Sequence, residues 1–366
     1  MCIAWKENSQ ANSKTYQQFE LSKGMTYVVK SNQTEKIKKK IRWCMNFKVN
    51  NGGWKIMKKS LLILVAVLLQ VSISYCQTDP KESDVLRGPY LGQTPPENQS
   101  KIFAPGFIST EFGELNSVFT NEGKEFYFSR RGMPGKRSMV MVTRMINDEW
   151  TKPEPVNFSG TNDDIDLFIT PDGNSMIYCS GKVQQKDGRA FIEHDFWIST
   201  RDGEKLTEPI LFAKEAMSEF EDYFPIVTQS GNLYLNSPRG GPGTNDIYCS
   251  TFINGKYTTA EKLPEPINTE YREFDAFVSQ DEEMIIFSTE KPGGLGSSDI
   301  CISFKNITGE WSEPKNLGSS INSEFSEYGA TITPDGKYLF FTSNRNGSED
   351  IYWVSAKIIE GFKPKE

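Results

Sequence analysis

Acidic and basic residues recur at fixed positions of this chain, and their spacing could build a charged binding site. An acid stands six residues before each of five polar anchor residues, and a base follows each anchor by ten to twelve residues. The acids are Glu114, Asp164, Asp222, Glu273 and Glu327, and the bases are Arg130 or Arg131, Lys182, Arg239, Lys291 and Arg345. Because successive strands run antiparallel, we expect both sets on one face of the fold.

This ring of charges has two interpretations. The first is a polar funnel that binds a charged ligand, a cation or a protein tail through the five acids together with Arg131, Arg239 and Arg345. The second is that each acid pairs with a base or caps a loop, once per repeat. Repetition in every copy favours the second interpretation, because a catalytic site needs acid and base in different environments.

Two further acids break the repeat. Asp166 and Asp275 stand two residues after their ring acids, where the other copies have Asn116, Phe224 and Gly329. A pair of carboxylates can hydrolyse a glycosidic bond as acid and base or nucleophile. Inward strand residues also make buried hydrogen bonds, so a structural role is the alternative. The pair is the catalytic candidate of the chain.

The elements that position these residues form a repeat of about fifty residues. The anchors are Thr120, Thr170, Thr228, Ser279 and Thr333, spaced by 50, 58, 51 and 54 residues. Each anchor precedes a turn such as Pro334-Asp-Gly, then a β-rich strand, then a third strand that begins with Asp in four copies. A fourth strand marked by proline follows in the first four copies. Four strands at this period predict a β-propeller blade.

The last copy carries a recognisable motif. Its Thr333-Pro-Asp-Gly-Lys, aromatic strand, Ser343-Asn-Arg and Asp350-Ile-Tyr resemble the WD-like propeller repeat of the C-terminal domain of TolB and of many exported bacterial proteins. The resemblance covers about residues 114–359, and the second and fourth copies also match well. It implies the fold and suggests export, but a shared fold does not identify an activity.

The repeat count predicts an all-β propeller of five four-stranded blades. Six blades are the alternative, because propellers of the TolB type often have six. The last copy lacks its own fourth strand, so we predict that a strand near Ile102 supplies it and removes an exposed edge.

The N-terminal region reads as a targeting segment. Met57-Lys-Lys-Ser, the apolar run 61–69 and a small residue before Gln77 predict a signal peptide over residues 57–76. The run is short for a membrane span, although an uncleaved anchor stays an alternative. Lipidation of Cys76 at the outer membrane is another alternative. A lipidation motif has a small residue directly before the cysteine, and the bulky Tyr75 argues against it. We interpret residues 1–56 as a non-native upstream extension, 77–112 as lead-in and closing strand, and 113–360 as the propeller.

Composition narrows the functional classes. The net charge is −7, which does not suggest a nucleic-acid partner. Cys179, Cys249 and Cys301 have no metal-site spacing and read as buried free thiols, with one bridge left open. The single histidine, His194, argues against a multi-histidine metal site, and Gly240-Gly-Pro-Gly lacks the lysine of a phosphate loop. We expect neither metal nor cofactor.

Together these patterns predict an exported, monomeric binding or scaffold module, periplasmic or secreted and not integral to the membrane after signal cleavage. One propeller face would recognise a protein or a glycan of the cell envelope. The alternatives are a carbohydrate-active hydrolase that uses Asp166 and Asp275, and an envelope component with no small ligand.

Overall fold

The computed structural model describes residues 16–21, 25–30 and 85–364, with gaps at 187–188, 204 and 242. The chain divides into two compact units, Met1–Ser83 and Asp84–Glu366. In the first unit, β1 (Tyr16–Leu21) pairs antiparallel with β2 (Met25–Lys30). The predicted signal peptide and Cys76 lie outside the described residues. No helix among the described residues is long and apolar enough to cross a membrane.

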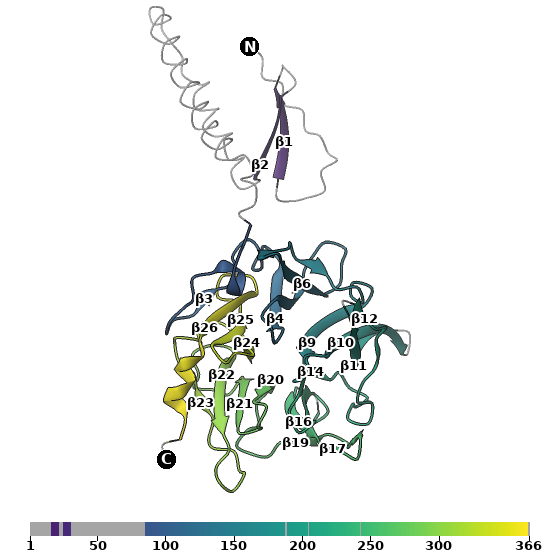
Figure 1. The fold of residues 1–366 in the computed structure, drawn as a ribbon, viewed down its shortest axis with the longest axis vertical. Helices are drawn as coiled ribbons and strands as arrows, with labels where there is room; N and C mark the ends of the chain where they lie inside the picture. Colours follow the sequence, from purple (N-terminus) through teal and green to yellow (C-terminus); the bar gives the residue numbers. More distant parts are fainter. Residues whose placement is uncertain are drawn as a thin grey trace, which may run out of the picture. The chain divides into compact units, whose positions relative to one another are not determined.

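The second unit is a β-propeller of five antiparallel sheets arranged around a central channel (Figure 1). The innermost strands are β4 (Gly113–Phe119), β9 (Asp163–Ile169), β14 (Tyr223–Val227), β20 (Glu273–Val278) and β24 (Glu327–Ile332). The predicted all-β propeller with five blades is therefore confirmed, and the six-bladed alternative is not. Its apolar cores lie between neighbouring blades, and each core takes side chains from several strands.

The next two strands of each blade follow the predicted pattern. The second strands are β5 (Glu125–Arg131), β10 (Ser175–Lys186), β15 (Leu233–Ser237), β21 (Met284–Thr289) and β25 (Tyr338–Ser343). The third strands are β6 (Met139–Ile146), β11 (Arg189–Asp202), β16 (Asp246–Ser250), β22 (Asp299–Phe304) and β26 (Asp350–Ser355). Asp195 lies inside β11 and does not begin it, because the insertion in blade 2 lengthens the β10–β11 hairpin as far as the pair Lys186 and Arg189.

The outermost strands are short. They are β7 (Glu149–Trp150) with β8 (Glu154–Pro155), β12 (Lys205–Leu206) with β13 (Ile210–Leu211), β19 (Glu261–Lys262), β23 (Lys315–Asn316) and β3 (Lys101–Ile102). Blade 3 adds a small hairpin of β17 (Phe252–Ile253) and β18 (Lys256–Tyr257). Two 3-10 helices, η1 (Pro89–Gly92) and η2 (Ala356–Phe362), flank the propeller strands in the sequence.

Strand β3 closes the ring. It pairs antiparallel with β26, with Ile102 opposite Tyr352 and Lys101 opposite Trp353, so the predicted closure is confirmed. The next residue, Phe103, is fully buried, and its ring centroid lies 4.9 Å from that of Phe340 and 5.2 Å from that of Trp353. Main-chain pairing and aromatic packing thus fasten the lead-in segment to the last blade.

Every innermost strand contains a bulge at the same position. The pairing of each with its second strand shifts register there, and the bulged residue has a positive φ. These residues are Asn116, Asp166, Phe224, Asp275 and Gly329, with φ between 44° and 63°. Only one is glycine, so four blades hold a side chain in a backbone conformation that L-residues disfavour. The bulges therefore place five equivalent residues around the middle of the channel.

Phe103→Ala tests the closure. We expect it to lower the free energy of unfolding by about 3–5 kcal/mol, because it leaves a cavity among four aromatic rings. Phe252→Ala, at a half-exposed ring of the blade 3 hairpin, is the control and should cost less than about 1 kcal/mol. Equal losses in urea unfolding of the two variants would contradict the role of this segment in closing the ring.

Candidate functional site

The five ring acids are buried. Each of Glu114, Asp164, Asp222, Glu273 and Glu327 is at most 1% exposed. Glu327 shows the shared pattern: it accepts hydrogen bonds from Ser323 N and Oγ, both at 2.7 Å, and from Ser343 Oγ at 2.6 Å. A Ser or Thr shortly before the strand supplies the equivalent bonds in three of the other four blades, and in blade 2 the hydroxyl comes from Ser159 and the N–H from Gly160. The acids therefore hold the loops that precede the innermost strands.

Three blades also form the predicted acid–base pair. Arg130 Nε lies 2.7 Å from Glu114, Arg239 lies 2.8 Å from Asp222, and Arg345 lies 3.2 Å from Glu327. Burial raises the pKa of Glu114 despite the bonds from Thr110 and Arg130. Because the acids are inaccessible and satisfied, the structure favours the architectural interpretation of the ring over ligand binding.

The other predicted bases behave differently. Arg131 pairs with Glu349 and not with Glu114. Lys182 lies over the ring of Trp197, with its Nζ 4.1 Å from the centroid. Within the described part of the chain, no basic side chain lies at ion-pair distance from Asp164 or Glu273, which hydroxyl groups satisfy instead.

The carboxyl groups of the two bulge acids, Asp166 and Asp275, interact electrostatically. Asp166 is 6% exposed and accepts hydrogen bonds from the amide of Asn116, from Phe224 N at 3.2 Å and from Cys179 Sγ at 3.9 Å. Burial raises its pKa to about 6. Burial and the charge of Asp166 raise the pKa of Asp275 well above its usual range. The charge of Asp166 thus disfavours ionisation of Asp275, a residue that is itself partly exposed.

His194 is a buried cation beside this pair. Its Nε2 lies 3.3 Å from Asp163, and its Nδ1 lies 3.3 Å from the Tyr223 hydroxyl and 3.8 Å from Glu221. Burial acts to lower the pKa of His194, but the bonds to Asp163 and Glu221 raise it to about 9. The bond from His194 lowers the pKa of Asp163 to about 2. His194 therefore connects Asp163 of blade 2 with Tyr223 and Glu221 at the start of the innermost strand of blade 3.

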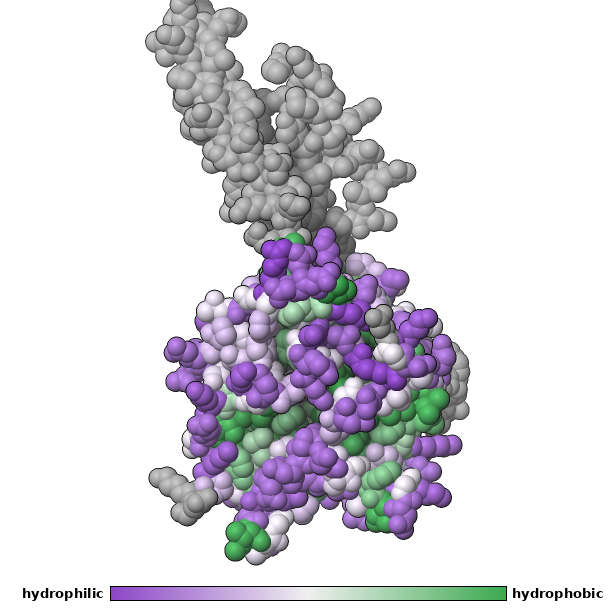
Figure 2. Space-filling view, viewed as in Figure 1, coloured by the Kyte–Doolittle hydropathy of each residue, from purple (hydrophilic) through white to green (hydrophobic). Residues whose placement is uncertain are grey.

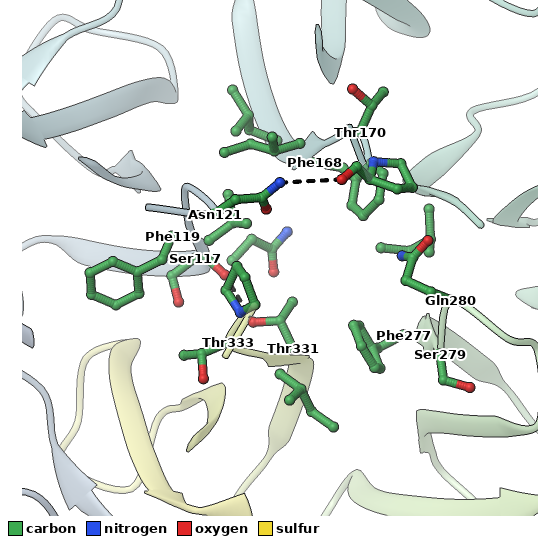
Figure 3. A pocket seen from close by; sticks show the side chains of 18 of the residues that line it. Ser117, Phe119, Asn121, Phe168, Thr170, Phe277, Ser279, Gln280, Thr331 and Thr333 are labelled. Carbon is green, nitrogen blue, oxygen red and sulfur yellow. Dashed lines mark hydrogen bonds between the residues drawn. The ribbon is translucent and has the colours of Figure 1, made fainter. Parts of the chain in front are cut away.

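A cavity of about 530 Å³ occupies the other end of the channel. It runs from the bulges at Asn116, Asp166 and Phe224 to the turns that follow the innermost strands, which we call the turn face. Apolar side chains such as Phe168 and Phe277 form its walls. Figure 3 shows these side chains around the central space, with Asn121 and Gln280 nearer the turns.

Amide side chains form part of the rim. Asn121, Gln229 and Gln280 each follow an anchor residue directly, and the other two blades have Pro171 and Pro334 there. Asn121 Nδ2 donates to Pro171 O at 3.2 Å, which links neighbouring blades. We did not predict this set, although the sequence shows an amide residue after the anchor in three of the five copies.

The described residues include no group of three or more His, Cys, Asp or Glu side chains placed to hold a metal ion. Cys179, Cys249 and Cys301 are free thiols, and Cys249 is only partly buried. The glycine-rich loop at Gly240 joins β15 to β16, as predicted for a loop between blade strands.

No family model and no curated protein matches the chain. Solved structures do match at low identity. A putative TolB from Agrobacterium tumefaciens is 18% identical, with 64% of this chain and 71% of that chain covered and a TM-score of 0.42. A thermostable family-43 glycoside hydrolase is 13% identical, covering 68% and 90%, with a TM-score of 0.44. An endo-arabinase from Bacteroides thetaiotaomicron VPI-5482 is 12% identical, covering 68% and 95%, with a TM-score of 0.43. These similarities concern the fold alone.

Glu327→Gln tests the architectural role of the ring acids. It removes the charge beside Arg345 and replaces one of the two carboxylate oxygens that accept from Ser323 and Ser343 with an NH2 donor, so we expect the free energy of unfolding to fall by about 3 kcal/mol. Glu324→Gln, in the same loop but exposed, should change it by less than about 0.5 kcal/mol. Urea unfolding measures both, and an unchanged Glu327→Gln variant would show that this acid is not structural.

Asp166→Asn tests how much the buried carboxylate at this bulge lowers the free energy of unfolding. Because its pKa is raised on folding, the wild-type free energy of unfolding should decline as pH rises from about 4 to about 6, on the order of 2–3 kcal/mol. The Asp166→Asn variant should lose much of this decline. Its melting temperature at pH 7.5 should be higher than that of the wild type. Asp172→Asn is the control, since hydrogen bonds from Thr170 and Asn174 lower the pKa of Asp172. A lower melting temperature for Asp166→Asn would contradict the prediction.

Proposed function

We propose that this chain is an exported binding module whose ligand, a protein segment or a glycan of the cell envelope, enters the central cavity from the turn face. The observation that carries the proposal is the cavity itself. Its volume of about 530 Å³ lies within the roughly 300–1,000 Å³ that ligand pockets commonly have. Apolar walls with a few convergent polar groups at floor and rim are the usual composition of such sites.

The remaining structure supports this choice of face. The ring acids of the opposite face are buried and occupied, so they offer a ligand little. The cavity walls come from innermost strands fixed by neighbouring blades, which favours a preformed site. Figure 2 shows hydrophilic residues over most of the visible surface, with apolar residues gathered toward its middle. Export through the signal peptide and action as a monomer belong to the same proposal.

One observation favours a second candidate function, a carbohydrate-active hydrolase. Asp166 and Asp275 occupy equivalent bulges, and each has a raised pKa. A glycosidase needs one carboxyl group that stays protonated while its partner is ionised. Against this role, Asn116, Phe224 and Cys179 already donate to the Asp166 carboxylate. We therefore rank the hydrolase below the binding module.

Gln280→Trp tests the cavity as the binding site. The intact chain is screened against envelope oligosaccharides and a peptide library, and the affinity of each hit is measured by calorimetry. The indole should narrow the rim, so we expect the variant to bind at least tenfold more weakly. Glu283→Trp places the same ring on the same turn but outside the cavity and should bind like wild type. Equal affinity of all three proteins would place binding elsewhere.

The same hits separate the two functions. A binding module leaves an oligosaccharide intact, whereas a hydrolase releases new reducing ends. If wild-type protein releases them and both Asp166→Asn and Asp275→Asn abolish the release without loss of binding, the hydrolase is correct and the ranking above is wrong.

A further inference from the structure

The floor of the cavity holds an unused hydrogen-bond acceptor. Asn116 is 7% exposed, and its amide nitrogen donates to Asp166, while its Oδ1 has no hydrogen-bond partner. A Cβ atom built at Gly329 would collide with this oxygen, so the missing side chain at the fifth bulge leaves open the space that Oδ1 faces. A buried acceptor without a donor is costly, and such groups are uncommon without a reason.

A carboxylate lies beside this acceptor. The Asp166 carboxylate accepts three hydrogen bonds, from Asn116, Phe224 and Cys179, and the Cys179 thiol is a weak donor. A carboxylate can accept about four hydrogen bonds, so its capacity is not exhausted. The floor thus offers a negative charge and two incompletely satisfied side chains.

The lining of the cavity contains no positive charge, although Arg131 and His194, which lie outside it and pair with Glu349 and Asp163, also act on the Asp166 carboxylate. Its lining residues include no Lys, Arg or His, and the only ionisable groups among them are Asp166 and Asp335. Asp335 is at the rim, where Lys337 Nζ at 2.9 Å and the Tyr90 hydroxyl at 2.7 Å already pair with it. An anion would therefore be repelled at the floor, and a neutral ligand can donate hydrogen bonds there but leaves the carboxylate charge unbalanced.

We propose that the cavity floor, at Asp166 and Asn116 Oδ1, binds a protonated amine or guanidinium carried on an apolar stem. The inference rests on the proposed function and adds the ligand chemistry. The charged head donates to the two acceptors, and the stem packs between walls that include Phe168 and Phe277 (Figure 3). A bare metal ion fits less well, because calcium needs six to eight oxygen ligands and the floor supplies two side chains.

Two sources of this chemistry are separated by matched probes. Nα-acetyl-lysine methylamide represents a lysine side chain, and Nα-acetyl-arginine methylamide represents an arginine side chain. Their neutral partners are Nα-acetyl-norleucine methylamide and Nα-acetyl-citrulline methylamide. Each probe is titrated into the intact chain by calorimetry and by displacement of any ligand found in the cavity screen.

At least one cationic probe should bind at least tenfold more tightly than its neutral partner, and the one that does so identifies the source. Asp166→Asn should abolish that preference, and its folding is checked by thermal unfolding in the same buffer. Glu283→Gln removes an exposed carboxylate from the same face and should keep the preference.

The contrary results are distinct. Equal binding of cationic and neutral probes, or a preference that survives in Asp166→Asn, overturns the inference while the cavity remains the site. Stabilisation of the wild type by CaCl2 that is lost in Asp166→Asn, with no binding of either cationic probe, makes the floor a metal site and also overturns it. Binding of the probes that Gln280→Trp leaves unchanged contradicts the proposed function itself.

Discussion

The buried carboxylate at the start of each innermost strand is the interaction on which the rest of the propeller depends. Such a group is costly to bury unless donors surround it, and all five blades provide them from the preceding loop, from the second strand or from an arginine. Each acid therefore fixes the loop that enters its blade and the register of the first two strands. Five repetitions therefore line one face of the molecule with buried acids, each satisfied by its own blade and the loop that enters it.

Because these acids are buried, a ligand cannot reach them, and the proposed function belongs to other parts of the channel. Below the buried acids, the bulges place one residue per blade around the middle of the ring, and there the blades are no longer alike. Asn116, Asp166, Phe224, Asp275 and Gly329 differ in size and charge, although their backbones share one conformation. A symmetric scaffold thus carries an asymmetric floor, which is what recognition of a particular ligand needs.

The floor is also where the structure is least satisfied. Asn116 Oδ1 has no partner, Asp166 is ionised only against the cost of burial, and four bulge residues have strained backbones. Strain and unfavourable burial persist where the surrounding structure enforces them, and they cluster at functional sites. The amide rim and the apolar walls of the cavity lead to the floor at Asn116 and Asp166. The residues that are costly to bury are therefore also the ones that the cavity makes accessible.

The sequence by itself determined the blade number, the strand order, the closing strand near Ile102 and the positions of the ring acids. These follow from local patterns: a turn of Pro-Asp-Gly, alternation along strands, and a period near fifty residues. It also aligned Asp166 with Asp275, because the repeat gives both the same register. Only the tertiary structure decided that Glu114 and its equivalents are buried, that Arg130 and not Arg131 pairs with Glu114, and that the cavity opens on the turn face. Burial and partner choice depend on five blades that meet around one axis, and no single repeat contains that information.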